Sequence, residues 1–294
     1  MATRAELIGP PVAPAARPPL ELQEVHGPSA LGDDPQRFRE LLWIMAVSDF
    51  RQTYANTALG FLWSIVKPLV FFGLIFIVLR QIFSFGGDIP NYGLILVLGL
   101  VLFTYFQEST TRALRSVPAR ETIVRKMKFP RLVIPLSACL ASAFTLLLNL
   151  VSVLPLFIAE GVYPRPSWLL LLPLLVLLVA FSTGIGLILA VLYLRVEDVG
   201  QGWTLVSRVL FYATPVLYPL TLLDEPFLQI ASLNPLAALI EQARVWVIDP
   251  DMPGPAEVAG PVIGVVIPLI LMIVVPLVGL WLFNRDAPRM AESL

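Results

Sequence analysis

The sequence predicts an all-α polytopic membrane protein with six transmembrane helices. Three observations lead to this fold class. The first is composition, because 57% of the 294 residues are hydrophobic and only 14% are charged, and such a chain cannot cover a water-soluble core with polar side chains. The second is a series of long apolar runs. The third is a one-sided distribution of Lys and Arg in the loops between those runs.

The apolar runs define the expected spans. A membrane-spanning helix needs about 20 consecutive apolar residues, and five runs reach that length while a sixth is shorter. The short run contains Arg208 and ends on Pro215 and Pro219, which predicts a tilted helix or one that breaks near the far side of the membrane. The expected spans are 61–83, 92–111, 132–159, 168–194, 202–217 and 261–283.

The basic residues predict the orientation of these spans. Lys and Arg near span ends stay on the cytoplasmic side, where the chain is made. With six crossings and both termini in the cytoplasm, only three of the 20 Lys and Arg residues lie outside, namely Arg80, Arg165 and Arg244. The densest group, seven cations from Arg112 to Arg131, then forms a cytoplasmic loop between the second and third spans.

The regions outside the spans differ in character. Residues 1–36 are rich in Pro and Ala, which predicts a disordered cytoplasmic leader, and 286–294 form a cytoplasmic tail. Residues 37–55 interleave apolar and charged side chains, as expected either of an amphipathic helix in the membrane interface or of one packed on its own bundle. Two short helices, 226–232 and 235–247, are expected to be re-entrant from the outer side before the last span.

Residues that would support catalysis or metal binding are scarce. No lysine follows a glycine, so the chain has no phosphate-binding loop of the Gly-Lys-Ser/Thr type. The single Cys139 and the single His26 cannot assemble a metal site. We therefore expect that the chain is not an enzyme, that it binds no cofactor itself and that it does not bind nucleic acid. If nucleotide energy is used, a second polypeptide must bind the nucleotide.

Several short motifs follow one another along this topology. They are Leu59-Gly60-Phe61-Leu62-Trp63, Lys67-Pro68, Lys128-Phe129-Pro130-Arg131 with Ile134-Pro135, Thr214-Pro215-Val216-Leu217-Tyr218-Pro219, and Leu233-Asn234-Pro235-Leu236. In this order they resemble the permease subunit of ABC-2 type exporters of bacterial cell-surface polysaccharides, the O-antigen and teichoic acid group. The resemblance covers about residues 37–285, of which 56–285 are the expected ABC-2 transmembrane domain. The Pro-rich leader lies outside it.

The resemblance implies a homodimer of this chain joined to two copies of a separate ATPase, which holds ATP and Mg²⁺. It also implies a coupling helix, a short cytoplasmic helix that docks on the ATPase, here within 117–126. Charged side chains of this segment and of the next cytoplasmic turn are the expected docking contacts: Arg115, Arg120, Glu121, Arg125, Lys126, Glu197 and Asp198. The alternatives are that the cations only set the orientation and that the second turn is a solvated turn.

The cargo of that family is a glycan on an undecaprenyl-type pyrophosphate carrier, taken from the cytoplasmic side of the inner membrane. Its pyrophosphate is expected to meet cations at the inner surface, and the candidates are Arg37, Arg39, Arg51 and Lys67. The alternative is that these cations are interfacial anchors. Sugar rings stack on aromatic side chains, and the candidates for lining the path are Tyr105, Phe106, Phe211, Tyr212 and Tyr218. Alternatively, these aromatic side chains pack helices together or form an aromatic belt at the membrane interface.

Three other functions fit parts of the sequence. An ABC-2 permease for a drug or a simple lipid would share the fold and differ in cargo. A membrane glycosyltransferase would need acidic residues in its aqueous loops, and the outer loops hold few. A proton-coupled carrier would need titratable groups in mid-span, where they are nearly absent. Polysaccharide export is therefore the expected function.

Overall fold

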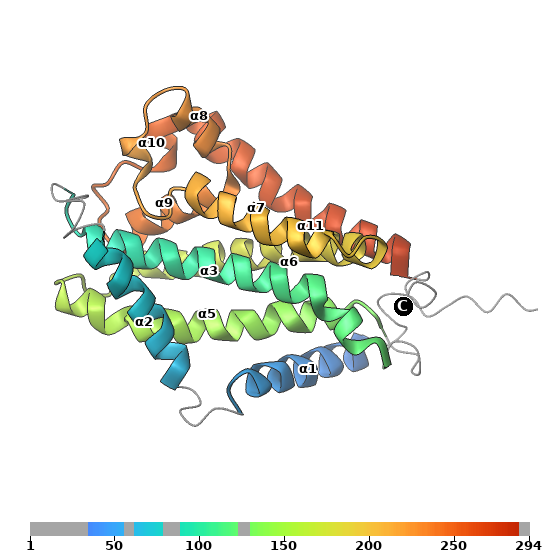
Figure 1. The fold of residues 1–294 in the computed structure, drawn as a ribbon. Coiled ribbons are helices and arrows are strands. Elements are labelled where there is room, and N and C mark those ends of the chain that lie inside the picture. The colour runs from blue at the N-terminus through green and yellow to red at the C-terminus, as the bar shows by residue number, and fades with distance from the viewer. Residues whose placement is uncertain (1–34, 56–61, 79–88, 123–129, 288–294) are drawn as a thin grey trace, which may run out of the picture.

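The computed structural model describes residues 35–55, 62–78, 89–122 and 130–287. Every regular element within these ranges is a helix, which confirms the predicted all-α class. The long helices run side by side along one direction, and the shorter helices of the 220–259 region gather at one end of the bundle (Figure 1). The leader 1–34 and the tail 288–294 lie outside the described residues.

Four helices in the described part of the chain are long and apolar enough to cross a membrane. They correspond to four of the six expected spans, with ends that differ by a few residues. Two of them are preceded by a turn of another helical type. A 3-10 turn at Pro166–Leu170 leads into the third of these helices, and a π turn at Val262–Val266 leads into the fourth. The four are α3 (Tyr92–Ser116), α5 (Val133–Ala159), α6 (Leu171–Arg195) and α11 (Ile267–Asp286).

The other two expected spans are shorter helices. Helix α2 covers Leu62–Ile77, and residues 79–88, where its span was expected to end, lie outside the described part. Helix α7 covers Val199–Ala213, so the expected range 202–217 begins three residues too late and ends four residues too late. At about 1.5 Å per residue, its 15 residues extend about 22 Å, less than the roughly 30 Å of a hydrocarbon core. Six crossings therefore remain a prediction.

The end of α7 has a local cause. Thr214 is extended, with φ −86° and ψ 138°, because Pro215 follows it and the proline ring disfavours a helical conformation in the residue before it. The helix therefore stops at Ala213 and the chain continues as a non-helical segment. Pro215 is part of the sequence, so an end of this helix near Ala213 could have been predicted from it.

Helix α1 (Pro35–Ala55) lies beside the first half of α5 (Figure 1). Trp43 and Phe50 of α1 both meet Phe144 of α5 edge to face, at 5.5 and 5.6 Å between ring centroids. The helix begins two residues before the expected range, because a proline in the first turn costs no hydrogen bond. Contact with the bundle is thus observed, and position in the membrane interface remains a prediction.

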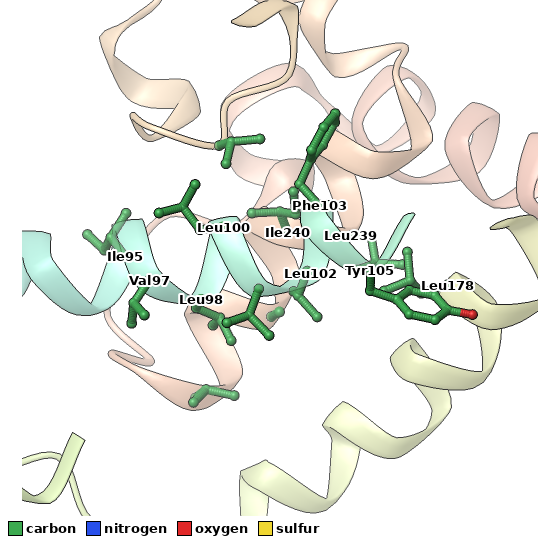
Figure 2. Close-up of a cluster of buried hydrophobic side chains, with 14 of the residues drawn as sticks. Ile95, Val97, Leu98, Leu100, Leu102, Phe103, Tyr105, Leu178, Leu239 and Ile240 are labelled. Carbon is green, nitrogen blue, oxygen red and sulfur yellow. The ribbon is translucent and has the colours of Figure 1, made fainter. Parts of the chain in front are cut away.

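Helix α3 forms the centre of the bundle. Its first half, from Tyr92 to Phe103, is apolar around its whole circumference, so this half is stable only where other parts of the protein cover every side. Figure 2 shows its side chains among Leu178 of α6 and Leu239 and Ile240 of α9 (Pro235–Val247). On another side of α6, the glycines Gly184 and Gly279 bring α6 and α11 together so closely that a Cβ on Gly279 would lie 2.5 Å from the Gly184 carbonyl oxygen.

The two short helices expected before the last span are both present. They are α8 (Phe227–Ser232) and α9, and a third short helix, α10 (Pro255–Ala259), follows them. Asn234 caps α9, because its side-chain oxygen accepts a hydrogen bond from the Leu236 backbone N–H at 3.0 Å. Almost every side chain of α9 is buried by other parts of the chain. Whether α8 and α9 enter a membrane from the outer side remains a prediction.

Candidate functional site

Charged residues from the ends of several long helices, which were expected in the cytoplasm, gather at one end of the bundle. We call this the basic end, where α3, α6 and α11 finish and α5 and α7 begin (Figure 1). Two contacts join its parts: the Arg195 guanidinium pairs with the Asp286 carboxylate, and Arg131 donates a hydrogen bond to the Ala287 carbonyl oxygen. Helices that the sequence predicted to end on one side of a membrane therefore do end together.

Arg120 connects three elements at the basic end. It ends the short turn η2 (Pro118–Arg120), which follows α3. Its guanidinium forms an ion pair with Asp49 of α1 and donates a hydrogen bond at 3.2 Å to the hydroxyl of Ser137 on α5. Both charged side chains are about four-fifths buried. Arg120 was expected to dock on an ATPase, which remains a prediction, and in the structure it ties η2 to α1 and α5.

The other expected docking residues divide into two groups. Arg115, Glu121, Glu197 and Asp198 are exposed at the basic end, on two turns that are far apart in sequence. Arg125 and Lys126 lie outside the described residues. The described members thus present both positive and negative side chains to solvent at the same end of the molecule.

The expected pyrophosphate contacts are spread along the chain. Arg37, Arg39 and Arg51 are all exposed on α1. Arg37 and Arg51 are 14 positions apart, which places their backbones about 21 Å from each other along the helix. Lys67 is on α2, and its side chain lies outside what the structure describes. The structure does not bring the described three together into one pocket.

The expected aromatic lining also falls into two groups. Tyr105 and Phe106 are buried inside the single chain, with 3% and 2% of their surface exposed. Phe211, Tyr212 and Tyr218 lie around the end of α7, where the Tyr218 hydroxyl donates to the Tyr212 carbonyl oxygen at 3.1 Å. Tyr212 exposes 69% of its surface, so of these five expected residues it is the one most open to a ligand or a second protomer.

Glu108 and Arg112 form the ion pair that their spacing of four residues on one helix face suggests. The nearest charged atoms are 3.9 Å apart, and both side chains are partly exposed. An exposed pair at this distance contributes little stability. The observed ion pair accounts for the two charges without a role for Glu108 in proton or substrate binding.

An open cleft of about 440 Å³ lies at the basic end between α1, α3, η2 and α5. Three guanidinium groups and several hydroxyl and amide groups face it, and two alanines of α5 line it. Its lining residues are Asp49, Gln52, Thr111, Arg112, Arg115, Ser116, Ala119, Arg120, Ala138 and Ala141. The sequence did not predict this cleft, because it depends on how α1 packs against the bundle.

A second polar cluster lies at the opposite end, around Arg244 of α9. The Arg244 side chain is fully buried and pairs with Glu241, which is also buried, at 2.8 Å. Burial lowers the pKa of Arg244, and the charge of Glu241 opposes that shift. The guanidinium donates to the carbonyl oxygens of Val216 at 2.9 Å and Tyr218 at 3.1 Å. The non-helical segment after α7 is thus held from inside the protein.

Two neighbours of Arg244 complete this cluster. The Tyr92 hydroxyl donates to the Leu217 carbonyl oxygen at 2.8 Å, so three consecutive carbonyl groups accept bonds from side chains. A Cβ on Gly99 would lie 2.6 Å from the Val216 carbonyl oxygen, so this position of α3 has room only for glycine. The sequence placed Arg244 in an exterior connection, and an isolated Glu-x-x-Arg pair in an apolar helix was the available signal of a buried pair.

Comparison with known proteins defines the class first. Residues 40–247 match the family of ABC-2 type transporters. This range is well over half of the chain, so the protein belongs to that family. With four apolar helices of spanning length in its described part, it is a multi-pass membrane protein.

The relatives with curated names narrow the class. An O-antigen export system permease protein RfbA of Klebsiella pneumoniae is 31% identical over 256 residues, which are 87% of this chain and 95% of the relative. A second Klebsiella pneumoniae protein of that name is 33% identical over 68% of this chain and 77% of its own length. RfbA of Myxococcus xanthus is 28% identical over 88% of this chain and 96% of its own.

Proposed function

We propose that this protein is the permease subunit of an ATP-driven exporter that moves lipid-linked O-antigen polysaccharide from the cytoplasmic side across the inner membrane. The observation that carries this proposal is the 31% identity to an O-antigen export system permease, extending over nearly the whole length of both chains. Similarity confined to one segment would support only a shared fold. Here the similarity covers 95% of the relative, and the family match 40–247 includes α7, α8 and α9.

The motor of this exporter is a separate ATPase in two copies, which holds ATP and Mg²⁺. It docks on the basic end through Glu121, Arg125 and Lys126 and through Glu197 and Asp198, whereas Arg115 lines the cleft beside α3. The exposed charges of the described members on two neighbouring turns support this assignment. Arg120 has a different part, because its ion pair with Asp49 passes movement of the docking segment to α1.

The polysaccharide path runs between two copies of the chain. Helix α7 supports this arrangement, because only two of its residues, Gly200 and Ser207, are buried in the single chain. Its exposed apolar side chains are left for contact with a second copy or with a sugar chain. Phe211, Tyr212 and Tyr218 line the path at the end of α7. Tyr105 and Phe106 stand behind it, since Phe106 meets Trp203 of α7 at 6.0 Å between ring centroids.

The carrier's pyrophosphate first meets Arg37, Arg39, Arg51 and Lys67, a series of cations along α1 and α2. Their exposure on α1 supports a row of successive contacts rather than one fixed site. Guanidinium groups suit this role because they bind phosphate oxygens through two parallel hydrogen bonds. Both termini of the chain face the cytoplasm in this arrangement.

Deleting the gene in its own bacterium tests the proposal. We expect the strain to lose surface polysaccharide and to accumulate lipid-linked polymer in the cytoplasmic leaflet, with restoration by the wild-type gene. The polymer is measured by carbohydrate blotting of surface-labelled cells and of isolated inner membranes. Unchanged surface polysaccharide with loss of another exported lipid or drug would assign a different cargo to the same fold.

The orientation gives a separate prediction from thiol labelling. The native Cys139 is buried and will not compete with introduced thiols. We expect Asn284→Cys at the basic end to react with a membrane-impermeant maleimide only after the inner membrane is opened. Tyr163→Cys, at an exposed position at the opposite end, should react in cells whose outer membrane alone is permeable. Wild-type protein is the unlabelled control, and the reverse pattern would overturn the proposed orientation.

A further inference from the structure

The cleft at the basic end carries an excess of positive charge. Arg112, Arg115 and Arg120 line it, and among the described residues of its lining Asp49 is the only acidic one. Asp49 is already paired with Arg120. The charge that remains for a ligand therefore comes from Arg112 and Arg115.

These two arginines are only weakly neutralised by their neighbours. Arg112 is 3.9 Å from Glu108 and donates to the Thr53 hydroxyl at 3.3 Å, both near the limit of a useful interaction. Arg115 has no ion pair with any residue that the structure describes. Two cations one helical turn apart repel each other, and an anion between them removes that repulsion.

The walls of the cleft suit a phosphate group. Gln52 and Thr111 add an amide and a hydroxyl group to the guanidinium groups. Ala138 and Ala141 have short side chains, which leave the space over α5 open. The ion pair of Arg120 with Asp49 fixes α1 against η2 and so sets the width of the cleft.

Exposed apolar side chains lie near the cleft on α1. Trp43 meets Phe144 of α5 and is more than half exposed, and so is its neighbour Ile44. Phe50, next to the cleft-lining Asp49, meets the same Phe144. A ligand with an anionic head and a hydrocarbon tail fits both features, because the head would enter the cleft while the tail packs on this part of α1.

We propose that this cleft binds the phosphate of a lipid headgroup, with Arg112 and Arg115 as its direct contacts and Arg120 as a positioning residue. The location on the cytoplasmic side rests on the proposed function. Two lipids carry the required chemistry, namely an anionic phospholipid and a polyprenyl pyrophosphate carrier. The cleft differs from the row of cations along α1 and α2, because its contacts come from α3.

Native mass spectrometry of the permease with its ATPase, purified in detergent, tests the site. Phosphatidylglycerol and a polyprenyl pyrophosphate are added separately as probes. We expect the double variant Arg112→Gln with Arg115→Gln to bind at least one probe about tenfold more weakly, the loss expected for charge-assisted hydrogen bonds. Arg115→Lys should retain part of the binding, since it keeps the charge and loses the planar fork. Arg285→Gln, an exposed arginine at the same end, is the matched control.

The two probes distinguish the sources. Loss with phosphatidylglycerol alone assigns the cleft to a membrane phospholipid, and loss with the pyrophosphate assigns it to the carrier. Ala119→Leu, which adds volume at an exposed position in the wall of the cleft without changing its charge, should weaken binding of the same probe in protein of unchanged melting temperature. Equal binding of both probes by wild-type and double-variant protein would overturn the site. Binding of phosphatidylglycerol does not depend on which cargo the protein exports. A failure of the proposed function would therefore appear in the gene-deletion experiment and not in this binding measurement.

Discussion

Replacing Arg244 with Leu should destabilise the protein by about 3–5 kcal/mol, because it leaves a buried carboxylate without its partner. Glu241 has no other compensating group: its second carboxylate oxygen has no hydrogen-bond partner within the described residues. The substitution also removes the donors to the Val216 and Tyr218 carbonyl groups. We expect most of the variant to be lost before it reaches the purified complex.

The measurement is the yield and melting temperature of the detergent-purified exporter. Arg39→Leu is the matched control, because Arg39 is exposed on α1, and exposed substitutions usually change stability by at most about 0.5 kcal/mol. The double variant Glu241→Leu with Arg244→Leu should recover part of the loss, since no charge stays buried. A single variant as stable as the control would show that the buried pair does not hold this end of the molecule.

The consequence for transport follows from where Arg244 acts. Arg244 and Tyr92 hold the segment after α7 through three consecutive carbonyl groups. Most side chains of α7 itself are exposed in the single chain. The end of α7 is therefore fixed, while one side of the helix contacts α3. In the proposed exporter, the exposed side would pack on a second copy or meet the cargo. Milder variants such as Tyr92→Phe should affect export more than stability.

The sequence predicted well what depends on local composition. Apolar runs of spanning length gave α3, α5, α6 and α11, because such runs are stable only as helices that satisfy their own backbone groups. The short helices α8 and α9 were predicted nearly to the residue, since prolines mark their starts. The end of α7 was missed although Pro215 was in view, because the apolar pattern continues beyond it.

What the sequence could not predict depends on contacts between distant residues. Arg244 bonds to the Ile95 carbonyl, 149 positions away, and Arg120 pairs with Asp49, 71 positions away. Neither partner can be found from spacing along a helix. The cleft at the basic end has the same origin, because α1 forms one of its walls only after it packs on α5. Local patterns thus predicted the helices, and their packing created the sites.

Exchanging the charges of Asp49 and Arg120 should separate two roles of Arg120. Arg120→Glu places a second carboxylate against Asp49 in a mostly buried setting, and we expect it to lower export about tenfold or more, equivalent to about 1.4 kcal/mol. The double variant Asp49→Arg with Arg120→Glu restores an ion pair of reversed direction. If Arg120 acts by joining the docking segment to α1, the double variant should recover export.

ATP hydrolysis and export must be measured together in membrane vesicles. Loss of the contact with α1 should leave hydrolysis by the complex in place while export falls, because the proposed docking contacts Glu121, Glu197 and Asp198 are unchanged. Loss of docking should instead release the ATPase from the purified complex. Arg120→Glu with Arg125→Glu extends the test to the segment outside the described residues. Normal export by Arg120→Glu and by Arg120→Glu with Arg125→Glu would contradict the coupling role of this segment. The ATPase would then have to dock on another part of the permease.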